Sequence, residues 1–324
     1  MAKIVLLSEH GGPEVLKTED RTPPSPGPGE VQIEHTAIGL NFIDVYHRTG
    51  LYPVSLPGSI GMEAAGVITA IGEGVDEFAP GDRVAYASPP LGAYAQIRVM
   101  PADRIVKIPD GIDDKTAAAI MLKGMTAWYL LRRVYEVGKK DTILFHAAAG
   151  GVGLIACQWA KALGATVIGT VGSKEKADLA RQYGCDHTIL YREEDFTERT
   201  RALTGGEGVP VVYDSIGRDT FMASLDCLKP FGLMVSFGNA SGPVDPFDIG
   251  ILAQKGSLFL TRPTLMTYTA RREDLVRAAE ELFERVLSGD IRVQIGQTYP
   301  LEKVADAHRD LEARKTTGST LLIP

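Results

Sequence analysis

The chain has 324 residues, 44% hydrophobic and 23% charged, a composition typical of a soluble globular protein long enough for two domains. Its net charge of −7 argues against nucleic acid or an anionic membrane surface as a partner. No apolar run reaches the ~18 residues that span a bilayer, and we expect no signal peptide. The three cysteines are isolated, which argues against a disulfide framework or a Cys-x-x-Cys zinc site and predicts a cytoplasmic protein.

The first 110 residues predict short strands joined by turns. The connector 22–29 is too rich in proline and glycine to be helical. Strands at this spacing favour a small β-barrel over a parallel sheet. Two stretches of helical composition, 116–121 and 126–137, then bridge into the next part of the chain. The predicted strands are 4–7, 31–38 and 81–86, with a glycine-punctuated apolar segment at 61–74.

A strand, a glycine turn and a helix follow one another from Thr142 to Gly164. The turn contains Gly150, Gly151 and Gly153, which permit a sharp bend and leave no side chain to block a ligand. A phosphate fits on the amide groups at the start of such a helix. The dinucleotide fingerprint departs from its strict form, because Ala148 takes the place of its first glycine, and a plain strand-to-helix turn also favours glycine.

The strand at 165–171 completes a β-α-β unit, and the residues after this strand bear on the choice of cofactor. An NAD site has an acidic residue at the end of this strand, but here Ser173 is followed by Lys174 and Lys176. Cations in a first helical turn oppose the helix dipole unless an anion binds there. We therefore expect NADPH, whose 2′-phosphate would be that anion; the alternative is a solvated surface turn.

Strands and helices alternate as far as residue 265, which predicts a doubly wound parallel sheet. The last strand, 257–261, would lie at the edge of this sheet and is nearly uncharged. Such an edge invites pairing with another chain, so we expect a homodimer in which these edges meet, unless a loop covers the edge. The other predicted elements are helices 174–183, 195–203 and 219–228, strands 187–191, 209–214 and 233–237, and a non-helical segment 238–256.

The C-terminal part of the chain has no place in a parallel sheet. An amphipathic helix at 272–288 is followed by strands 293–299 and 320–323 around a helix at 301–313. We expect these last strands to rejoin the N-terminal barrel, which makes the nucleotide-binding domain an insertion. The apolar face of the helix at 272–288 consists of Leu275, Ala278, Ala279, Leu282 and Val286.

Several motifs resemble those of the medium-chain dehydrogenase/reductase superfamily. In this chain, Gly61-Met-Glu-Ala-Ala-Gly66, followed by Gly72 and Gly81-Asp-Arg-Val84, resembles the N-terminal domain signature of that superfamily. The resemblance covers essentially the whole chain and implies a GroES-like catalytic domain, 1–125 and 266–324, with an inserted NADPH-binding Rossmann domain, 126–265. Similarity to the zinc-independent quinone oxidoreductase (zeta-crystallin-like) branch rests on Asn41-Phe-Ile-Asp-Val-Tyr46, Gly50-Leu-Tyr52, Ala147-Ala-Ala-Gly-Gly-Val-Gly153 with Gln158 and Lys161, Val212-Tyr-Asp-Ser215 and Ser236-Phe-Gly-Asn239.

Departures from the zinc alcohol dehydrogenase branch define the expected chemistry. That branch has Cys at the position of Asn41 and His at the position of Met62, and neither an amide nor a thioether suits a catalytic zinc site. Its lobe of four closely spaced cysteines is absent too. The resemblance therefore implies metal-free hydride transfer from nicotinamide C4 to a quinone. Two alternatives stay open: reduction of activated double bonds such as enones, and a non-catalytic NADPH-binding protein of crystallin or RNA-binding type.

The resemblance also implies a set of site residues. Asn41, Tyr46 and Tyr52, with Asp44, would form the acceptor pocket, although tyrosines in a loop are often packing residues and solvent could protonate the quinol. Three of the cofactor contacts named below have an alternative interpretation. Arg314 would then be a cation at a solvated helix end, Arg262 would form a structural ion pair, and Thr126 would be a helix N-cap. His146 is best interpreted as a core histidine. Implied cofactor contacts are Asn41, Thr126 near Lys123, Gly150, Gly151, Val152, Gly153, Gly172, Ser173, Lys176, Tyr191, Ser215, Phe237, Gly238, Asn239, Arg262, Thr264 and Arg314.

Overall fold

A computed structural model describes residues 1–324, and the chain divides into two compact units. The first unit comprises 1–125, 269–287 and 293–324, and the second 126–268 and 288–292. The second unit therefore extends slightly beyond 126–265. Its short return segment is held by two hydrogen bonds: Gln158 Nε2 donates to the Arg292 carbonyl at 3.0 Å, and the Arg292 N–H donates to Gln158 Oε1 at 2.9 Å.

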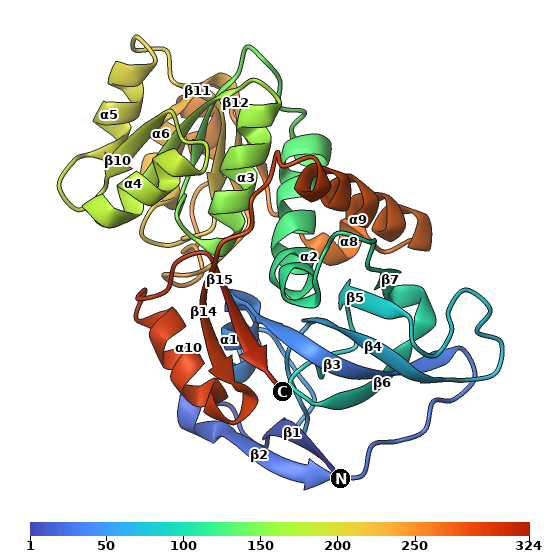
Figure 1. Ribbon diagram of the computed structural model, residues 1–324. Coiled ribbons are helices and arrows are strands. Elements are labelled where there is room, and N and C mark those ends of the chain that lie inside the picture. The colour runs from blue at the N-terminus through green and yellow to red at the C-terminus, as the bar shows by residue number, and fades with distance from the viewer. The chain divides into compact units, whose positions relative to one another are not determined.

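A seven-stranded sheet is the centre of the first unit, with strand order β14-β15-β3-β4-β5-β7 and with β6 paired to β3 (Figure 1). The predicted return of the C-terminal strands is confirmed, because β15 pairs antiparallel with β3. The connector 22–29 contains no helix, as expected. The strands are β1 (Ala2–Leu7) and β2 (Leu16–Arg21), which form a separate pair, and β3 (Glu30–Leu40), β4 (Glu63–Ile71), β5 (Arg83–Ala87), β6 (Ile97–Pro101), β7 (Val106–Lys107), β14 (Ile295–Pro300) and β15 (Ser319–Ile323).

Two C-terminal helices accompany this sheet. In α9 (Arg272–Leu287) the expected apolar face is buried except for Val286, which is only partly covered, and Phe283 joins it. α10 (Val304–Glu312) follows a 3₁₀ turn at Leu301–Lys303 and is shorter than predicted. Leu301, Val304 and Ala307 pack into the core of the sheet, so these elements close one end of the unit.

The second unit is a six-stranded parallel sheet in the order β10-β9-β8-β11-β12-β13, which confirms the doubly wound prediction. The strand order reverses between β8 and β11, and ligands bind at the carboxyl edge beside such a reversal. Figure 1 shows α3 and α4 on the near face of this sheet. The elements are β8 (Thr142–Phe145), α3 (Gly151–Ala162), β9 (Thr166–Val171), α4 (Lys174–Gln182), β10 (His187–Leu190), α5 (Phe196–Leu203), β11 (Val209–Asp214), α6 (Phe221–Asp226), β12 (Leu228–Ser236) and β13 (Phe259–Thr261).

The two helical stretches predicted before this sheet are one continuous helix, α2 (Asp114–Tyr129), which ends in a π turn at Leu130–Val134. Gly124 does not break the helix, and it packs so closely on Leu282 that a Cβ there would come within 2.4 Å of a leucine methyl carbon. Thr126 is inside α2, so the N-cap alternative for this residue is wrong.

The prediction that the segment 238–256 is wholly non-helical is wrong. The segment contains a short helix, α7 (Gly250–Gln254), and the Asp248 carboxylate accepts a hydrogen bond from the Gly250 N–H at 2.8 Å where this helix begins. The edge strand β13 is also shorter than 257–261, since Ser257 has a left-handed φ of 55° that interrupts extended pairing. A four-residue helix, α8 (Leu265–Tyr268), comes after the strand.

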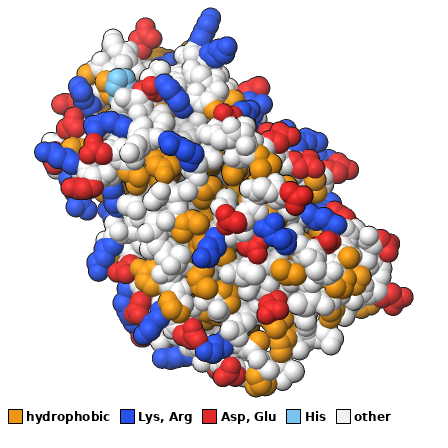
Figure 2. All heavy atoms as spheres, viewed as in Figure 1, with side chains coloured by type: hydrophobic (Ala, Val, Ile, Leu, Met, Phe, Trp, Pro, Cys, Tyr) orange, Lys and Arg blue, Asp and Glu red, His pale blue; other side chains and the backbone are white.

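No helix is both long and apolar enough to cross a membrane. On the face seen in Figure 2, acidic and basic side chains are interspersed.

Candidate functional site

The predicted acceptor residues surround the start of helix α1 (Phe42–Thr49) in the first unit. Asn41 is the N-cap, and its N–H donates to Asp44 Oδ2 at 2.9 Å in a capping box that fixes where the helix begins. Tyr46 therefore lies on a helix and not in a loop, which corrects the prediction. Its ring meets that of Tyr52 edge-on at 5.1 Å, and the Tyr52 N–H donates to the Tyr46 carbonyl at 3.1 Å. These four residues form one cluster.

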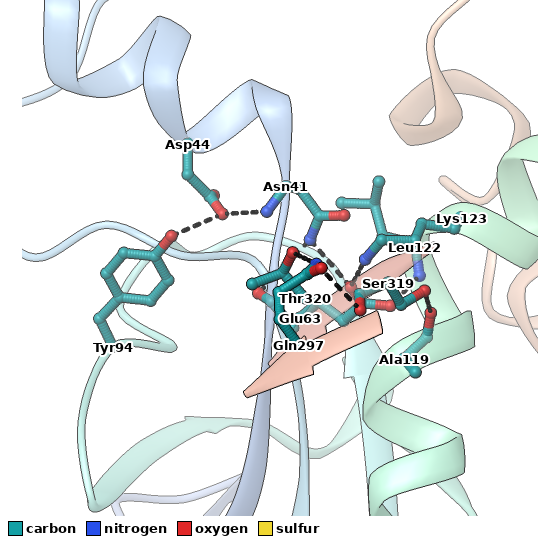
Figure 3. A network of polar contacts seen from close by, with 11 residues as sticks. Asn41, Asp44, Glu63, Tyr94, Ala119, Leu122, Lys123, Gln297, Ser319 and Thr320 are labelled. Atoms are coloured by element: carbon teal, nitrogen blue, oxygen red, sulfur yellow. Dashed lines mark hydrogen bonds and ion pairs between the residues drawn. The ribbon is translucent and has the colours of Figure 1, made fainter. Parts of the chain in front are cut away.

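The side chain of Asn41 is held by a buried carboxylate from the neighbouring strand β4. Asn41 Nδ2 donates to Glu63 Oε2 at 2.8 Å and to the Gly39 carbonyl at 3.4 Å. Glu63 also accepts the Leu122 N–H at 2.7 Å and pairs with Lys123 Nζ at 2.9 Å, as Figure 3 shows. The Asn41 amide nitrogen therefore donates to two protein acceptors, and these bonds fix the orientation of the side chain.

Asp44 is fully buried on the other side of Asn41. Its Oδ2 accepts a hydrogen bond from Tyr94 Oη at 2.9 Å (Figure 3), and its Oδ1 has no partner. Burial raises the pKa of Asp44 to about 7, although the bonds from Asn41 and Tyr94 and the charge of Lys123 oppose this shift. A carboxyl group with this pKa changes its ionisation near neutral pH.

Glu63 and Tyr94 were missed as site residues by sequence reasoning. The signal for Glu63 is a single acid at the head of the apolar run Glu63-Ala-Ala-Gly66, because an unpaired carboxylate is costly in a buried strand. Tyr94 carries no comparable signal, since its link to Asp44 spans 50 residues.

In the second unit the glycine turn has the geometry of a phosphate cradle. Gly150 caps α3 without a side-chain hydrogen bond, and no acid lies in the first turn. A Cβ on Gly153 would lie 2.4 Å from the Ala147 carbonyl oxygen, so only glycine fits there. Gly169 on β9 faces Ala148 so closely that a Cβ would be 2.6 Å from the alanine methyl group, which explains how alanine is accommodated in the fingerprint. The Gly150 N–H donates to the Ala147 carbonyl at 2.8 Å, but no side chain caps the amides of the first turn of α3, so these suit an anion.

The residues predicted for the 2′-phosphate gather at the end of β9. Ser173 caps α4, with its Oγ accepting the Lys176 N–H at 3.3 Å. The Tyr191 hydroxyl lies against Gly172, where a Cβ would be 2.9 Å away. A phosphate is suited to this place by the hydroxyl and ammonium groups of the turn and by the N-terminus of α4. Arg314 belongs to the first unit and stays a prediction.

The carboxyl ends of β11, β12 and β13 bring together most of the remaining predicted cofactor residues. Gly238 packs on Ser215, with room for no side chain: a Cβ would lie 2.5 Å from the serine carbonyl oxygen. Arg262 Nη1 donates to the Ser236 carbonyl at 3.0 Å. With the Asn239 side-chain amide turned to match its neighbours, Arg262 Nη2 donates to the amide oxygen at 3.3 Å. Phe237 lies beside the Phe145 ring at 5.8 Å, and Thr264 Oγ1 bonds Thr267 at 3.1 Å.

His146 is a core histidine, as interpreted. It is 1% exposed, and its ring nitrogens bond Thr170 Oγ1 at 2.9 Å and Ser224 Oγ at 3.0 Å. Burial lowers its pKa, so the ring is neutral. The contacts connect β9 to α6 and leave no ring nitrogen for a ligand. In the described chain no three His, Cys, Asp or Glu side chains form a group suited to a metal ion.

Comparison with known proteins agrees with this architecture. The family described as "Alcohol dehydrogenase GroES-like domain" matches residues 27–110, and "Zinc-binding dehydrogenase" matches 151–284. A quinone oxidoreductase of Pseudomonas aeruginosa is 56% identical over the full length of both chains. The crystal structure of Escherichia coli quinone oxidoreductase complexed with NADPH is 53% identical, with a TM-score of 0.98 and full coverage of both chains. A 2-haloacrylate reductase of Burkholderia is 46% identical over 100% of this chain and 99% of its own.

A GroES-like unit joined to a doubly wound parallel sheet with a glycine phosphate turn defines a medium-chain dehydrogenase/reductase. Within that superfamily the chain belongs to the quinone oxidoreductase family.

Proposed function

We propose that this protein is an NADPH:quinone oxidoreductase, reducing a quinone without a catalytic metal. The observation that carries the proposal is full-length identity of 53–56% to quinone oxidoreductases, together with a cation-bearing turn after β9 where an NAD site has an acid. The glycine cradle and the Ser173–Lys176 turn fit the phosphates of NADPH. When bound, this cofactor supplies the hydride.

We assign distinct tasks to the two units. The second unit, 126–265 and its extensions, holds the cofactor through Gly150 to Gly153 at the pyrophosphate and through the carboxyl ends of β11 and β12 at the nicotinamide. The first unit provides the acceptor pocket, in which the Tyr46–Tyr52 pair offers aromatic walls and phenol groups to a quinone oxygen as it gains charge. The free, buried cysteines support a cytoplasmic location.

Side-by-side kinetics test this function. We expect NADPH oxidation to depend on 1,4-benzoquinone and to be faster with it than with a short enone at equal concentration, since a quinone accepts hydride more readily. The 46% identity to a 2-haloacrylate reductase makes activated double bonds the second candidate substrate class. A preference for the enone or for 2-chloroacrylate would favour that class, and NADPH binding without turnover of either would indicate a non-catalytic binding protein.

We further propose a homodimer formed through β13. Phe259 is 62% and Leu260 38% exposed on this edge strand, an apolar edge that is unpaired within the chain. Replacing Phe259 with Lys is expected to yield monomers, because a charge on an edge strand opposes pairing. Light scattering after gel filtration measures the mass. Met222→Lys, on α6 and 43% exposed, is the matched control and should stay dimeric; equal masses for both variants and the wild type would refute the β13 interface.

A further inference from the structure

A buried chain of hydrogen bonds links the two ends of α1 through α10 and Tyr94. Arg48, 1% exposed, binds both carboxylate oxygens of Glu312 at 2.8 Å, and its Nη1 lies 3.1 Å from His308 Nδ1. His308 Nε2 is 3.1 Å from Tyr94 Oη, which is 2.9 Å from Asp44 Oδ2. Asp44, Tyr94 and His308 are all inaccessible to solvent. The chain therefore connects α10 to Asp44, at the start of the helix that carries the predicted acceptor residues.

The end groups fix the direction of every bond in this chain. Arginine can only donate, so His308 Nδ1 accepts and the neutral ring carries its proton on Nε2. Burial, with a smaller contribution from the Arg48 charge, lowers the pKa of His308 to about 3, which keeps the ring neutral. His308 then donates to Tyr94, and Tyr94 donates to Asp44. Because Arg48 does not release a proton, this chain orients groups and does not conduct protons.

Asp44 joins this chain to the helix that carries the acceptor residues. Its Oδ2 also accepts the Asn41 N–H, and this bond closes the capping box of α1. A carboxylate at this position interacts favourably with the helix dipole, and protonation removes that interaction. Two other charges act on Asp44: Lys123, which favours the ionised form, and Glu63, which opposes it.

We propose that Tyr94 and His308 are positioning residues, which hold Asp44 as a carboxylate and thereby fix the Asn41–Tyr46 end of α1 for acceptor binding. The inference rests on the proposed quinone reductase function. It gives a positioning role to a tyrosine and a histidine that are not among the predicted acceptor residues Asn41, Asp44, Tyr46 and Tyr52. Acceptor binding is accordingly tighter when Asp44 is ionised, so kcat/KM for quinone rises with pH through the titration of this carboxyl, which lies near pH 7.

The pH dependence of kcat/KM for 1,4-benzoquinone tests the proposal. Tyr94→Phe keeps the ring but removes the bond that lowers the pKa of Asp44, so the rising limb should move up by about one pH unit. Asp44→Asn should abolish the limb. Tyr86→Phe is the matched control, because Tyr86 is equally buried and bonds His35 Nε2 at 2.9 Å, and its limb should stay in place. An unmoved limb in Tyr94→Phe, or one that persists in Asp44→Asn, overturns the proposal.

A substrate-free measurement separates this inference from the proposed function. The pKa of Asp44 rises from 3.8 when unfolded to about 7 when folded, so the wild type should lose stability relative to Asp44→Asn as pH rises between these values. In a Tyr94→Phe background this loss of stability should continue to a pH about one unit higher, because the pKa of Asp44 in the folded protein is higher. Thermal unfolding at a series of pH values measures it. The same window in both backgrounds refutes the link between Tyr94 and Asp44. If the wild type does not reduce quinone but Tyr94→Phe still shifts the window, only the proposed function is refuted.

Discussion

Replacing Lys176 with alanine is expected to reduce the preference for NADPH over NADH by about 10- to 100-fold, while the affinity for NADH changes little. Lys176 lies in the first turn of α4, where its backbone N–H binds the Ser173 cap, and we propose that its ammonium group binds the 2′-phosphate. A hydrogen bond to a charged group contributes about 1.5–3 kcal/mol, which corresponds to this factor. Fluorescence titration of both cofactors measures the ratio.

Lys174 is the matched control, since it is exposed in the same turn of the same helix. Lys174→Ala should retain most of the preference. If Lys176→Ala keeps the wild-type ratio, or if both variants lose it equally, Lys176 does not bind the phosphate and the choice of NADPH must have another cause.

Breaking the Glu63–Lys123 pair is expected to have the largest effect on stability. Both side chains are buried, at 0% and 7% exposure, and their charged atoms lie 2.9 Å apart. Lys123→Met leaves the Glu63 carboxylate without its cation, which costs about 3–5 kcal/mol. The double variant Glu63→Gln/Lys123→Met should recover much of this loss, because no buried charge remains unpaired. Urea unfolding followed by circular dichroism gives the difference.

An exposed ion pair in the same unit provides the comparison. Arg309 and Asp306 are each about half exposed, and Arg309→Met should cost no more than ~1 kcal/mol. A double variant as unstable as Lys123→Met alone would mean that the hydrogen bonds of Glu63, and not the ion pairing, stabilise this region.

The second unit was predictable because its information is local. Each strand, turn and helix of a βαβ unit is contiguous in the sequence, so the apolar run before Gly150 and the glycine stop at Gly164 indicated the elements directly. The exceptions depend on contacts between distant residues. Just before this unit, Gly124 continues a helix while Leu282 packs against it, and no pattern in the α2 segment reveals this contact.

The acceptor region was predictable in its residues but not in their arrangement. Asn41, Asp44, Tyr46 and Tyr52 are close in sequence and form one cluster, as their family motif implied. Their partners come from β4, from the loop that contains Tyr94 and, through the hydrogen-bond chain, from α10. Such pairings are set by the tertiary fold and leave only an isolated charged residue in an apolar segment as a sequence signal.

A single-turnover experiment tests the central claim most directly. Enzyme with one equivalent of NADPH is mixed anaerobically with 1,4-benzoquinone, and nicotinamide absorbance and quinol are followed together, with metal analysis of the same sample. We predict one quinol formed for each NADPH oxidised, in a single phase, with no stoichiometric zinc. Oxidation of NADPH without quinol, or turnover that requires stoichiometric zinc, would contradict metal-free quinone reduction by this protein.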